Sequence, residues 1–111
     1  MPAPRLAVVG AGPIGLEAAL LGKERGWEVT VFEAGRIGEH LLQWGHLRFF
    51  TPLRMNISAR ALRLLPQAPP LDSILSGREH VEQVLQPLSA HLTVYTGQRV
   101  QAICRRNLQR Q

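Results

Sequence analysis

One hexapeptide, Gly-Ala-Gly-Pro-Ile-Gly at residues 10–15, constrains the possible folds of this chain more than any other part of the sequence. Residues 5–9 before it form a short apolar run with a β-branched end, which is typical of a strand covered on both faces. Residues 14–25 after it carry small side chains at helical spacing, so a helix there can approach a sheet closely. Glycines at such a junction permit backbone conformations and contacts that larger side chains prevent. The sequence therefore predicts a tight strand–turn–helix unit.

A second strand completes this unit. Gly26 stands where helices commonly end in a left-handed residue, and residues 28–33 read Glu-Val-Thr-Val-Phe-Glu, which favours a strand. Strand, helix and strand together span about 30 residues, the usual length of a βαβ unit. Glu33 ends the second strand, about 20 residues after the glycines. An acidic residue there can accept hydrogen bonds from the hydroxyls of an adenosine ribose.

The spacing of the glycines indicates what they would bind. Gly10 makes the tight turn, Gly12 lets a pyrophosphate approach backbone N–H groups without a Cβ in the way, and Gly15 lets helix and strand pack closely. The helix N-terminus, with unpaired N–H groups and a positive dipole end, favours the diphosphate. Glu33 favours FAD or NAD over NADP, although Arg36 nearby could bind a 2′-phosphate. The predicted dinucleotide site consists of Gly10, Gly12, Pro13, Ile14, Gly15, Glu33 and Ala34.

The rest of the chain adds a long connection and further elements. Residues 35–75 are rich in glycine and proline, with helical turns expected near 36–43 and 58–64, and are interpreted as an irregular insertion. A Ser-x-x-Glu capping box starts a helix over residues 76–90, which Pro87 should kink or end. Residues 92–96 predict a third strand, and residues 100–104 a fourth with Cys104 buried in it. We expect one α/β, Rossmann-like domain over residues 1–111, with a small, incomplete parallel sheet in the strand order 3-2-1.

Composition argues against several other functions. The net charge of +5 comes from 13 basic and 8 acidic side chains. The excess lies in a C-terminal tail without interleaved aromatic residues, so nucleic-acid binding is not expected. The tail arginines are Arg99, Arg105, Arg106 and Arg110. The histidines and the single cysteine have no metal-ligand spacing. Because no apolar stretch approaches about 18 residues and no signal peptide is recognised, the sequence predicts a cytoplasmic chain without a membrane partner.

The glycine motif and its surroundings resemble a known group. Residues 8–19 (Val-Val-Gly-Ala-Gly-Pro-Ile-Gly-Leu-Glu-Ala-Ala) and 31–34 (Val-Phe-Glu-Ala) are similar to the N-terminal FAD-binding segment of flavin-containing monooxygenases and pyridine-nucleotide-disulfide oxidoreductases. The resemblance implies FAD bound through its ADP half and reduced by NAD(P)H bound elsewhere. Residues 38–56 resemble the group less closely, because Glu39 replaces the second glycine of a Gly-Gly pair. Their Trp-Gly-His and Phe-Thr-Pro steps are similar to those of FAD-dependent oxidoreductases.

The resemblance also implies a piece of a longer protein. Similar domains continue into a β-meander, another parallel strand and an NAD(P)H-binding domain. We therefore expect the FAD-binding portion of an NAD(P)H-dependent flavoprotein oxidoreductase, monooxygenase-like in type, in which no residue of this chain is assigned a catalytic role. The alternative is a small non-catalytic module that binds NAD or another ADP nucleotide. An open sheet edge would favour self-association or pairing with the missing remainder.

Three polar residues of the insertion could have roles at the site. His46 could touch a flavin or substrate and transfer a proton, and Arg48 or Arg54 could meet a phosphate or carboxylate. Each also fits an ordinary loop position, hydrogen-bonded for the histidine and solvated for the arginines. The sequence assigns none of them a catalytic role.

Overall fold

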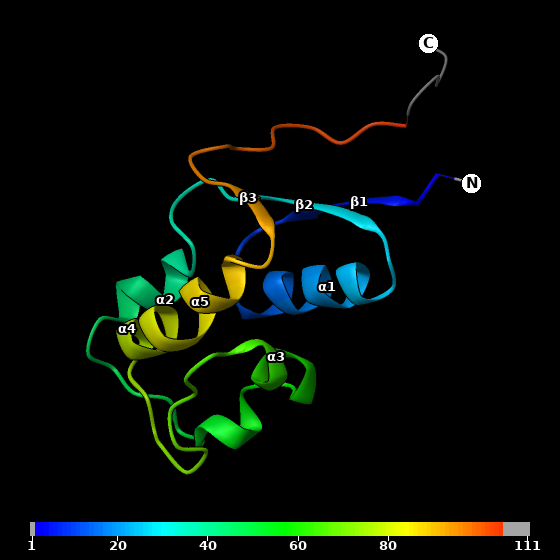
Figure 1. Ribbon diagram of the computed structural model, residues 1–111. Helices are drawn as coiled ribbons and strands as arrows, with labels where there is room; N and C mark the ends of the chain where they lie inside the picture. Colours follow the sequence, from blue (N-terminus) through cyan, green and yellow to red (C-terminus); the bar gives the residue numbers. More distant parts are fainter. Residues whose placement is uncertain (1, 106–111) are drawn as a thin grey trace.

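The computed structural model describes residues 2–105, and these form a three-stranded parallel sheet with helices packed against one face (Figure 1). The segment between the second and third strands carries short helices, and its middle part, drawn in green, lies farthest from the sheet (Figure 1). In chain order the elements are β1 (Arg5–Val9), α1 (Pro13–Glu24), β2 (Glu28–Phe32), α2 (Glu39–Trp44), η1 (Leu53–Met55), α3 (Ala59–Leu64), α4 (Gly77–His80), η2 (Val81–Leu85), α5 (Gln86–Ser89) and β3 (Thr93–Tyr95).

The sheet has β2 in its centre. β1 pairs with β2 in parallel, and β2 pairs in parallel with β3, which gives the order β1-β2-β3. Val31 of β2 lies between Val8 and Val94 in this register and is fully buried. The predicted Rossmann-like α/β fold and the strand order, read from the opposite edge as 3-2-1, are confirmed.

Small side chains allow α1 to lie close to the sheet, as the sequence predicts. A Cβ added at Gly22 would come within 2.9 Å of Leu6 and 3.0 Å of Val29, so a larger side chain there would push the helix outward. The apolar side of α1, including Leu16 and Leu20, is buried. Gly26 follows the helix with a φ of 81°, the left-handed conformation expected at its end.

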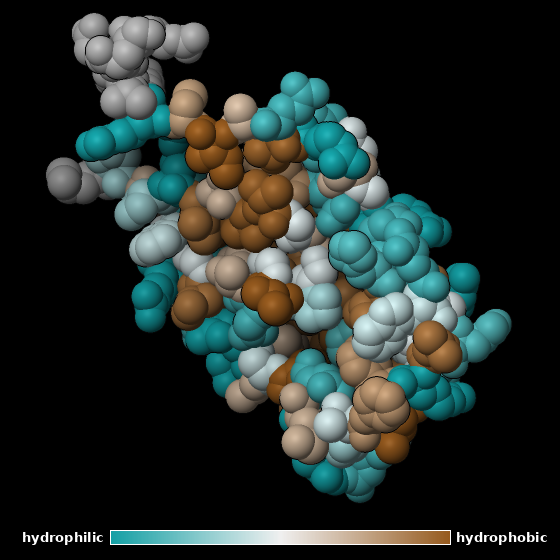
Figure 2. Space-filling view, turned by 180° about the vertical axis from the view of Figure 1, so that it is seen from behind, coloured by the Kyte–Doolittle hydropathy of each residue, from teal (hydrophilic) through white to brown (hydrophobic). Residues whose placement is uncertain are grey.

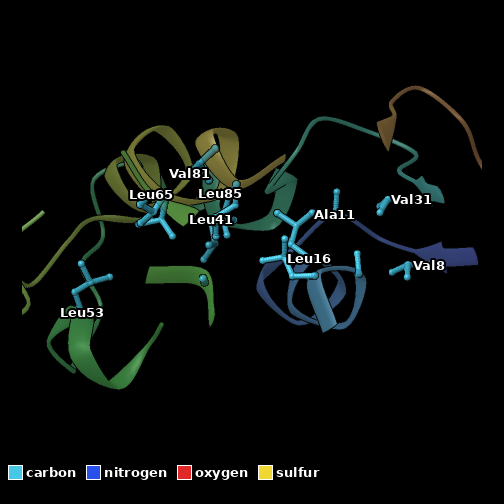
Figure 3. Close-up of a cluster of buried hydrophobic side chains, with 14 of the residues drawn as sticks. Val8, Ala11, Leu16, Val31, Leu41, Leu53, Leu65, Val81 and Leu85 are labelled. Carbon is cyan, nitrogen blue, oxygen red and sulfur yellow. The ribbon is translucent and has the colours of Figure 1, made fainter. Parts of the chain in front are cut away.

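The buried side chains form two adjoining groups (Figure 3). One lies between the sheet and α1 and includes Val8, Val31 and Leu16. The other lies among the helices and includes Leu41 and Val81. Because both groups belong to one continuous cluster, packing of the helices on each other is coupled to packing on the sheet.

Residues 77–89 are helical throughout, as α4, η2 and α5. The predicted capping box is present: Glu79 N–H donates to Ser76 Oγ at 3.1 Å, and Ser76 N–H donates to Glu79 Oε1 at 2.8 Å. Pro87 does not end the helix. Instead η2, immediately before α5, is a π-helical turn, whose wider hydrogen-bond spacing accommodates the missing N–H and the bulk of the proline ring.

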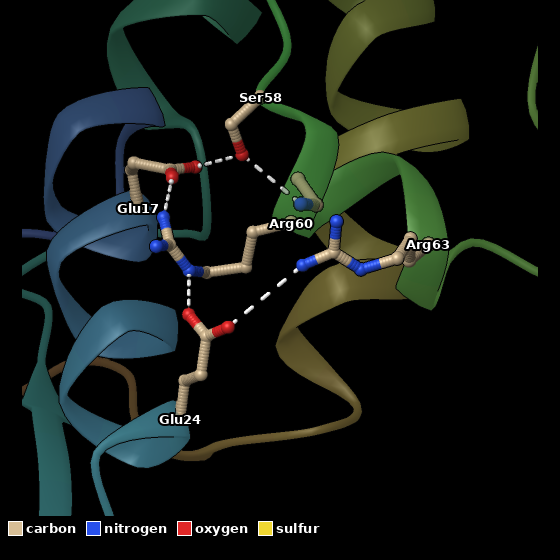
Figure 4. Close-up of polar contacts among 6 residues, drawn as sticks. Glu17, Glu24, Ser58, Arg60 and Arg63 are labelled. Atoms are coloured by element: carbon tan, nitrogen blue, oxygen red, sulfur yellow. Dashed lines mark hydrogen bonds and ion pairs between the residues drawn. The ribbon is translucent and has the colours of Figure 1, made fainter.

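An ion-pair network joins α3 to the outer side of α1 (Figure 4). Arg60 contacts two acids of α1, with Nη1 at 2.9 Å from Glu17 Oε1 and Nε paired with Glu24. Ser58 caps α3 by accepting the Ala61 N–H, and its hydroxyl donates to Glu17 at 2.8 Å. A single exposed ion pair adds little stability, but this network anchors residues 58–64 to the helix that begins at the glycine turn.

The predicted fourth strand is not formed, and the prediction for Cys104 is wrong. Residues 100–104 are extended but belong to no strand, and Cys104 is exposed. Alternating apolar residues form a strand when a neighbouring strand supplies hydrogen-bond partners, and within residues 2–105 none pairs with them. Arg106 and Arg110 of the predicted basic tail lie outside the described residues.

Apolar side chains also remain on the surface. Val9 and Tyr95 on the outer face of the sheet are 57% and 53% exposed, and both neighbour Phe32 in the register of the strands. Seen from behind, the molecule shows a group of adjacent hydrophobic side chains in its upper half (Figure 2). Parallel sheets are usually covered on both faces, so the helices here provide half of the usual cover. Within the described part of the chain, no helix is long and apolar enough to span a bilayer.

His80 is a buried titratable residue at the end of α4. The residue is 1% exposed, and its ring packs on Phe49, with ring centroids 5.0 Å apart. Burial lowers the pKa of His80 from 6.5 to about 4, because the charged ring would lose its hydration. The folded protein therefore holds His80 neutral where an unfolded chain would protonate it.

We predict a stability loss on acidification that depends on His80. Between pH 6.5 and 4 the unfolded state binds the extra proton, so the free energy of unfolding should fall by up to about 3 kcal/mol as pH decreases across this window. Urea unfolding at several pH values would measure it. His80→Phe keeps an aromatic ring against Phe49 and should show a flatter profile above pH 4.5. Equal slopes for the two proteins would contradict the assignment.

Candidate functional site

A cavity of about 660 Å³ lies at the carboxyl ends of β1 and β2, beside the start of α1. This is the edge of an open parallel sheet at which ligands of such folds bind. The residues predicted from the sequence that line it are Gly10, Gly12, Pro13, Glu33 and Ala34. Ile14 and Gly15 do not line it. The structure thus gathers five of the seven predicted residues around one space.

The glycine turn leaves the start of α1 open toward this cavity. Gly10 has a φ of +106°, a conformation that favours glycine, and its N–H donates to Phe32 O at 2.8 Å. Gly12 precedes the helix in an extended conformation, no side chain caps it, and a Cβ there would have no atom within 4 Å. Pro13 begins the helix and has no N–H to leave unpaired. The remaining free N–H groups of the first turn can meet an anion placed over Gly12.

The two other residues of the motif serve the fold and a neighbouring surface. A Cβ at Gly15 would lie 2.0 Å from Gly10 O, so Gly15 is needed for the contact between helix and turn. Ile14 is 87% exposed and lines a second hollow, described below. Gly15 therefore positions the site without touching its cavity.

Glu33 is half-buried and held by two backbone donors. Its Oε1 accepts the Ala11 N–H at 2.8 Å, and its Oε2 accepts the Gly35 N–H at 2.7 Å. These bonds orient the carboxylate beside the glycine turn. A carboxylate oxygen has two acceptor positions, so each oxygen can still accept a hydrogen bond from a ligand hydroxyl. Ala34, which follows, is exposed at the cavity wall.

The loop before α2 adds residues that the predicted site did not include. Gly38 has a φ of 69°, its N–H donates to Ala11 O at 2.9 Å, and a Cβ there would lie 2.5 Å from Val81. The sequence shows that residue 38 is a glycine, but it does not show the contact with Val81. The sequence gives no comparable signal for Gln98, Arg99 and Val100, which reach the cavity because the chain after β3 passes over it.

Glu39 brings a second carboxylate to the cavity. Its oxygens accept from Arg36 Nε and Nη2, each at 2.9 Å, and Oε1 also accepts the Arg36 backbone N–H at 2.9 Å. These hydrogen bonds lower the pKa of Glu39 to about 2 and raise the pKa of Arg36. The Glu39 charge is therefore present, and compensated by Arg36, throughout the neutral pH range.

A second hollow, of about 700 Å³, lies on the other side of Pro13. Aromatic and apolar side chains such as Phe49 and Met55 share its lining with Glu17 and Asn56. The Asn56 amide is held by the carbonyls of Thr51 and Pro52, at 3.2 Å each. Pro13 borders both spaces, so a ligand lying over the start of α1 could reach into each of them.

Three polar residues of the insertion, His46, Arg48 and Arg54, lie away from both spaces. His46 is exposed and lines neither of them. Arg48 donates to Ile74 O at 2.8 Å and pairs with Glu79 at 3.3 Å, and Arg54 pairs with Asp72. Both arginines therefore serve contacts within the insertion and with α4. Among residues 2–105 no group of three or more His, Cys, Asp and Glu is arranged to hold a metal ion.

Comparisons with known proteins find matches to the glycine segment and to the fold. The sequence profile of the family described as pyridine nucleotide-disulphide oxidoreductase matches residues 5–38, which contain the whole glycine motif and Glu33. Bacillithiol disulfide reductase Bdr from Staphylococcus aureus has a similar structure, with a TM-score of 0.68 and 21% sequence identity over 87% of this chain and 29% of that chain. This chain thus spans less than a third of that reductase. No curated protein sequence matches it. The predicted resemblance to the N-terminal segment of this group is confirmed.

Two glycine substitutions should separate ligand binding from folding. Gly12→Val places a side chain in open space over the helix N-terminus, so the fold should persist while ADP binding weakens about 10- to 100-fold through lost phosphate contacts. Gly15→Val places atoms on Gly10 O and should lower the free energy of unfolding by about 1–3 kcal/mol or more. Calorimetry with ADP and thermal unfolding would measure the two effects. Wild-type ADP affinity in folded Gly12→Val would contradict the site.

Proposed function

We propose that this chain binds the ADP half of FAD in the cavity between Gly12 and Glu33, as the cofactor-binding portion of a flavoprotein oxidoreductase. The observation that carries the proposal is the uncapped start of α1, which faces the same cavity as an oriented carboxylate. In ADP a diphosphate is joined to a ribose. Dinucleotide-binding folds bind the diphosphate at a helix N-terminus and the ribose at a carboxylate that lies beside it. The family match over residues 5–38 supports the same reading.

Each part of the site has a distinct task in this proposal. Backbone N–H groups at the start of α1 bind the pyrophosphate, and Gly12 leaves room for it. Glu33 accepts the ribose hydroxyls, while the bonds from Ala11 and Gly35 keep its carboxylate in place. Bound flavin would supply the hydride chemistry, and this chain binds and orients the cofactor.

The second hollow favours FAD over NAD as the ligand. It begins at Pro13, where the pyrophosphate would lie, and offers Phe49 and Met55 to a large ring system and Asn56 to polar groups. The expected similarity of residues 43–56 to monooxygenase-like flavoproteins concerns this same segment. We therefore propose the monooxygenase-like type, with NAD(P)H as the reductant in a full-length relative.

The alternative ligand is NAD or another ADP nucleotide. The cavity that would hold the ADP moiety is formed entirely by described residues of this chain, and its volume of about 660 Å³ is sufficient for ADP alone. Under this alternative the chain would bind nucleotides without turnover.

The open edge of the sheet suggests how the piece would find a partner. β1 is an edge strand, and Val9 on it is 57% exposed. We propose that this edge pairs with another copy or with the remainder of a longer protein, since unpaired strand edges tend to recruit strands.

FAD retention provides the decisive test. The 111-residue protein, incubated with excess FAD and desalted, should keep visible flavin absorbance near one equivalent. Glu33→Gln removes the charge that accepts the ribose hydroxyls and should weaken ADP binding about tenfold in calorimetry. Glu28→Gln, an equal charge change at the exposed far end of β2, should leave the affinity unchanged.

The outcomes separate the two candidate functions. Retained flavin supports the FAD proposal. A folded, colourless protein that binds NAD and ADP with equal affinity would favour the nucleotide-binding module. A folded protein that binds neither FAD nor ADP would overturn both.

A further inference from the structure

Arg36 and Glu39 form a closed pair at the rim of the candidate nucleotide cavity. The guanidinium meets the carboxylate through Nε and Nη2, each at 2.9 Å, and the Arg36 backbone N–H adds a third bond to Oε1. Two parallel bonds of this kind fix both side chains more firmly than a single contact. Glu39 lines the cavity, whereas Arg36 does not.

This pair stands next to the predicted ribose position. Gly35 links the two carboxylates, because its N–H donates to Glu33 Oε2 at 2.7 Å, while a Cβ on it would lie 2.8 Å from Glu39 Oε1. Arg36 follows Gly35 directly in the chain. An arginine side chain is long enough that, released from Glu39, it could reach a group bound at Glu33.

The pairing with Glu39 prevents Arg36 from binding an adenosine 2′-phosphate. An arginine near the end of β2 is the usual partner of an adenosine 2′-phosphate, and the sequence offers Arg36 for that role. In the structure its hydrogen-bonding edge is directed at Glu39. A 2′-phosphate would therefore meet Glu33 and the Glu39 carboxylate without a free cation from Arg36.

We propose that Glu39 acts as a latch that withholds Arg36 from the ribose, so that the Arg36–Glu39 pair, together with Glu33, selects adenosine ligands with a free 2′-hydroxyl. This inference rests on the proposed nucleotide site and adds a selectivity device to it. Its carrying observation is the double hydrogen bond of Arg36 to a carboxylate that lines the cavity. Glu33 provides attraction for the hydroxyl, and the latch removes the attraction that Arg36 would provide for a phosphate, which leaves Arg99 as the arginine that lines the cavity.

The test uses two ligands that differ in one group, ADP-ribose and 2′-phospho-ADP-ribose, with affinities measured by calorimetry at low ionic strength. Wild-type protein should prefer ADP-ribose by at least about tenfold. Glu39→Gln releases Arg36 and should reduce this preference by about tenfold, through tighter binding of the 2′-phosphate. Asp72→Asn removes an equal charge from the pair with Arg54, outside the cavity, and should leave the preference unchanged.

A double variant decides whether Arg36 is responsible. In Arg36→Gln/Glu39→Gln the preference for ADP-ribose should return to near the wild-type ratio, because no cation is released. If the double variant binds the 2′-phosphate as well as Glu39→Gln does, loss of the Glu39 charge alone explains the change and the latch is wrong. An unchanged preference in Glu39→Gln also overturns it.

The inference and the proposed function fail differently. Absence of ADP-ribose binding by the wild-type protein would overturn the nucleotide site itself, and the latch with it. ADP-ribose affinity near the wild-type value serves as the folding control for each variant. If Glu39→Gln loses ADP-ribose affinity, Glu39→Ala also releases Arg36 and places a good helix-forming residue in the first turn of α2.

Discussion

The contact between Gly15 and the carbonyl oxygen of Gly10 is the constraint on which the rest of the structure depends. A Cβ at Gly15 would lie 2.0 Å from that oxygen, so this close approach of helix and turn excludes any side chain. The approach brings the start of α1 against the end of β1, and the buried side of the helix then packs on Val8 and Val31. The junction of β1 with α1, and the cavity beside it, therefore depend on one short backbone contact.

Ala11 connects this junction to the rest of the site. It is fully buried, its N–H donates to Glu33, and its carbonyl accepts from Gly38. Through these two bonds the glycine turn, the end of β2 and the loop before α2 share one residue. The candidate ribose acceptor is therefore positioned by the same backbone that leaves space at Gly12.

The insertion between β2 and α4 is held to this framework by two different means. Apolar residues such as Leu41 and Leu53 join the common core, and Arg60 links α3 to acids of α1. Arg48 pairs with the capping residue Glu79. Polar residues that resemble site residues in the sequence thus serve to dock a long connection, because a segment with little regular structure needs specific contacts to be ordered.

The sequence by itself determined the local units: the glycine turn, α1 and its left-handed end, the capping box at Ser76, three strands and the acid at Glu33. These depend on residues close together in the chain. Only the tertiary structure decided which of the possible contacts form. Within residues 2–105 no strand pairs with residues 100–104, η2 widens to accommodate Pro87, and Arg36 is occupied by Glu39. Pairing, strain relief and charge compensation are properties of the assembled chain, and sequence spacing alone does not specify them.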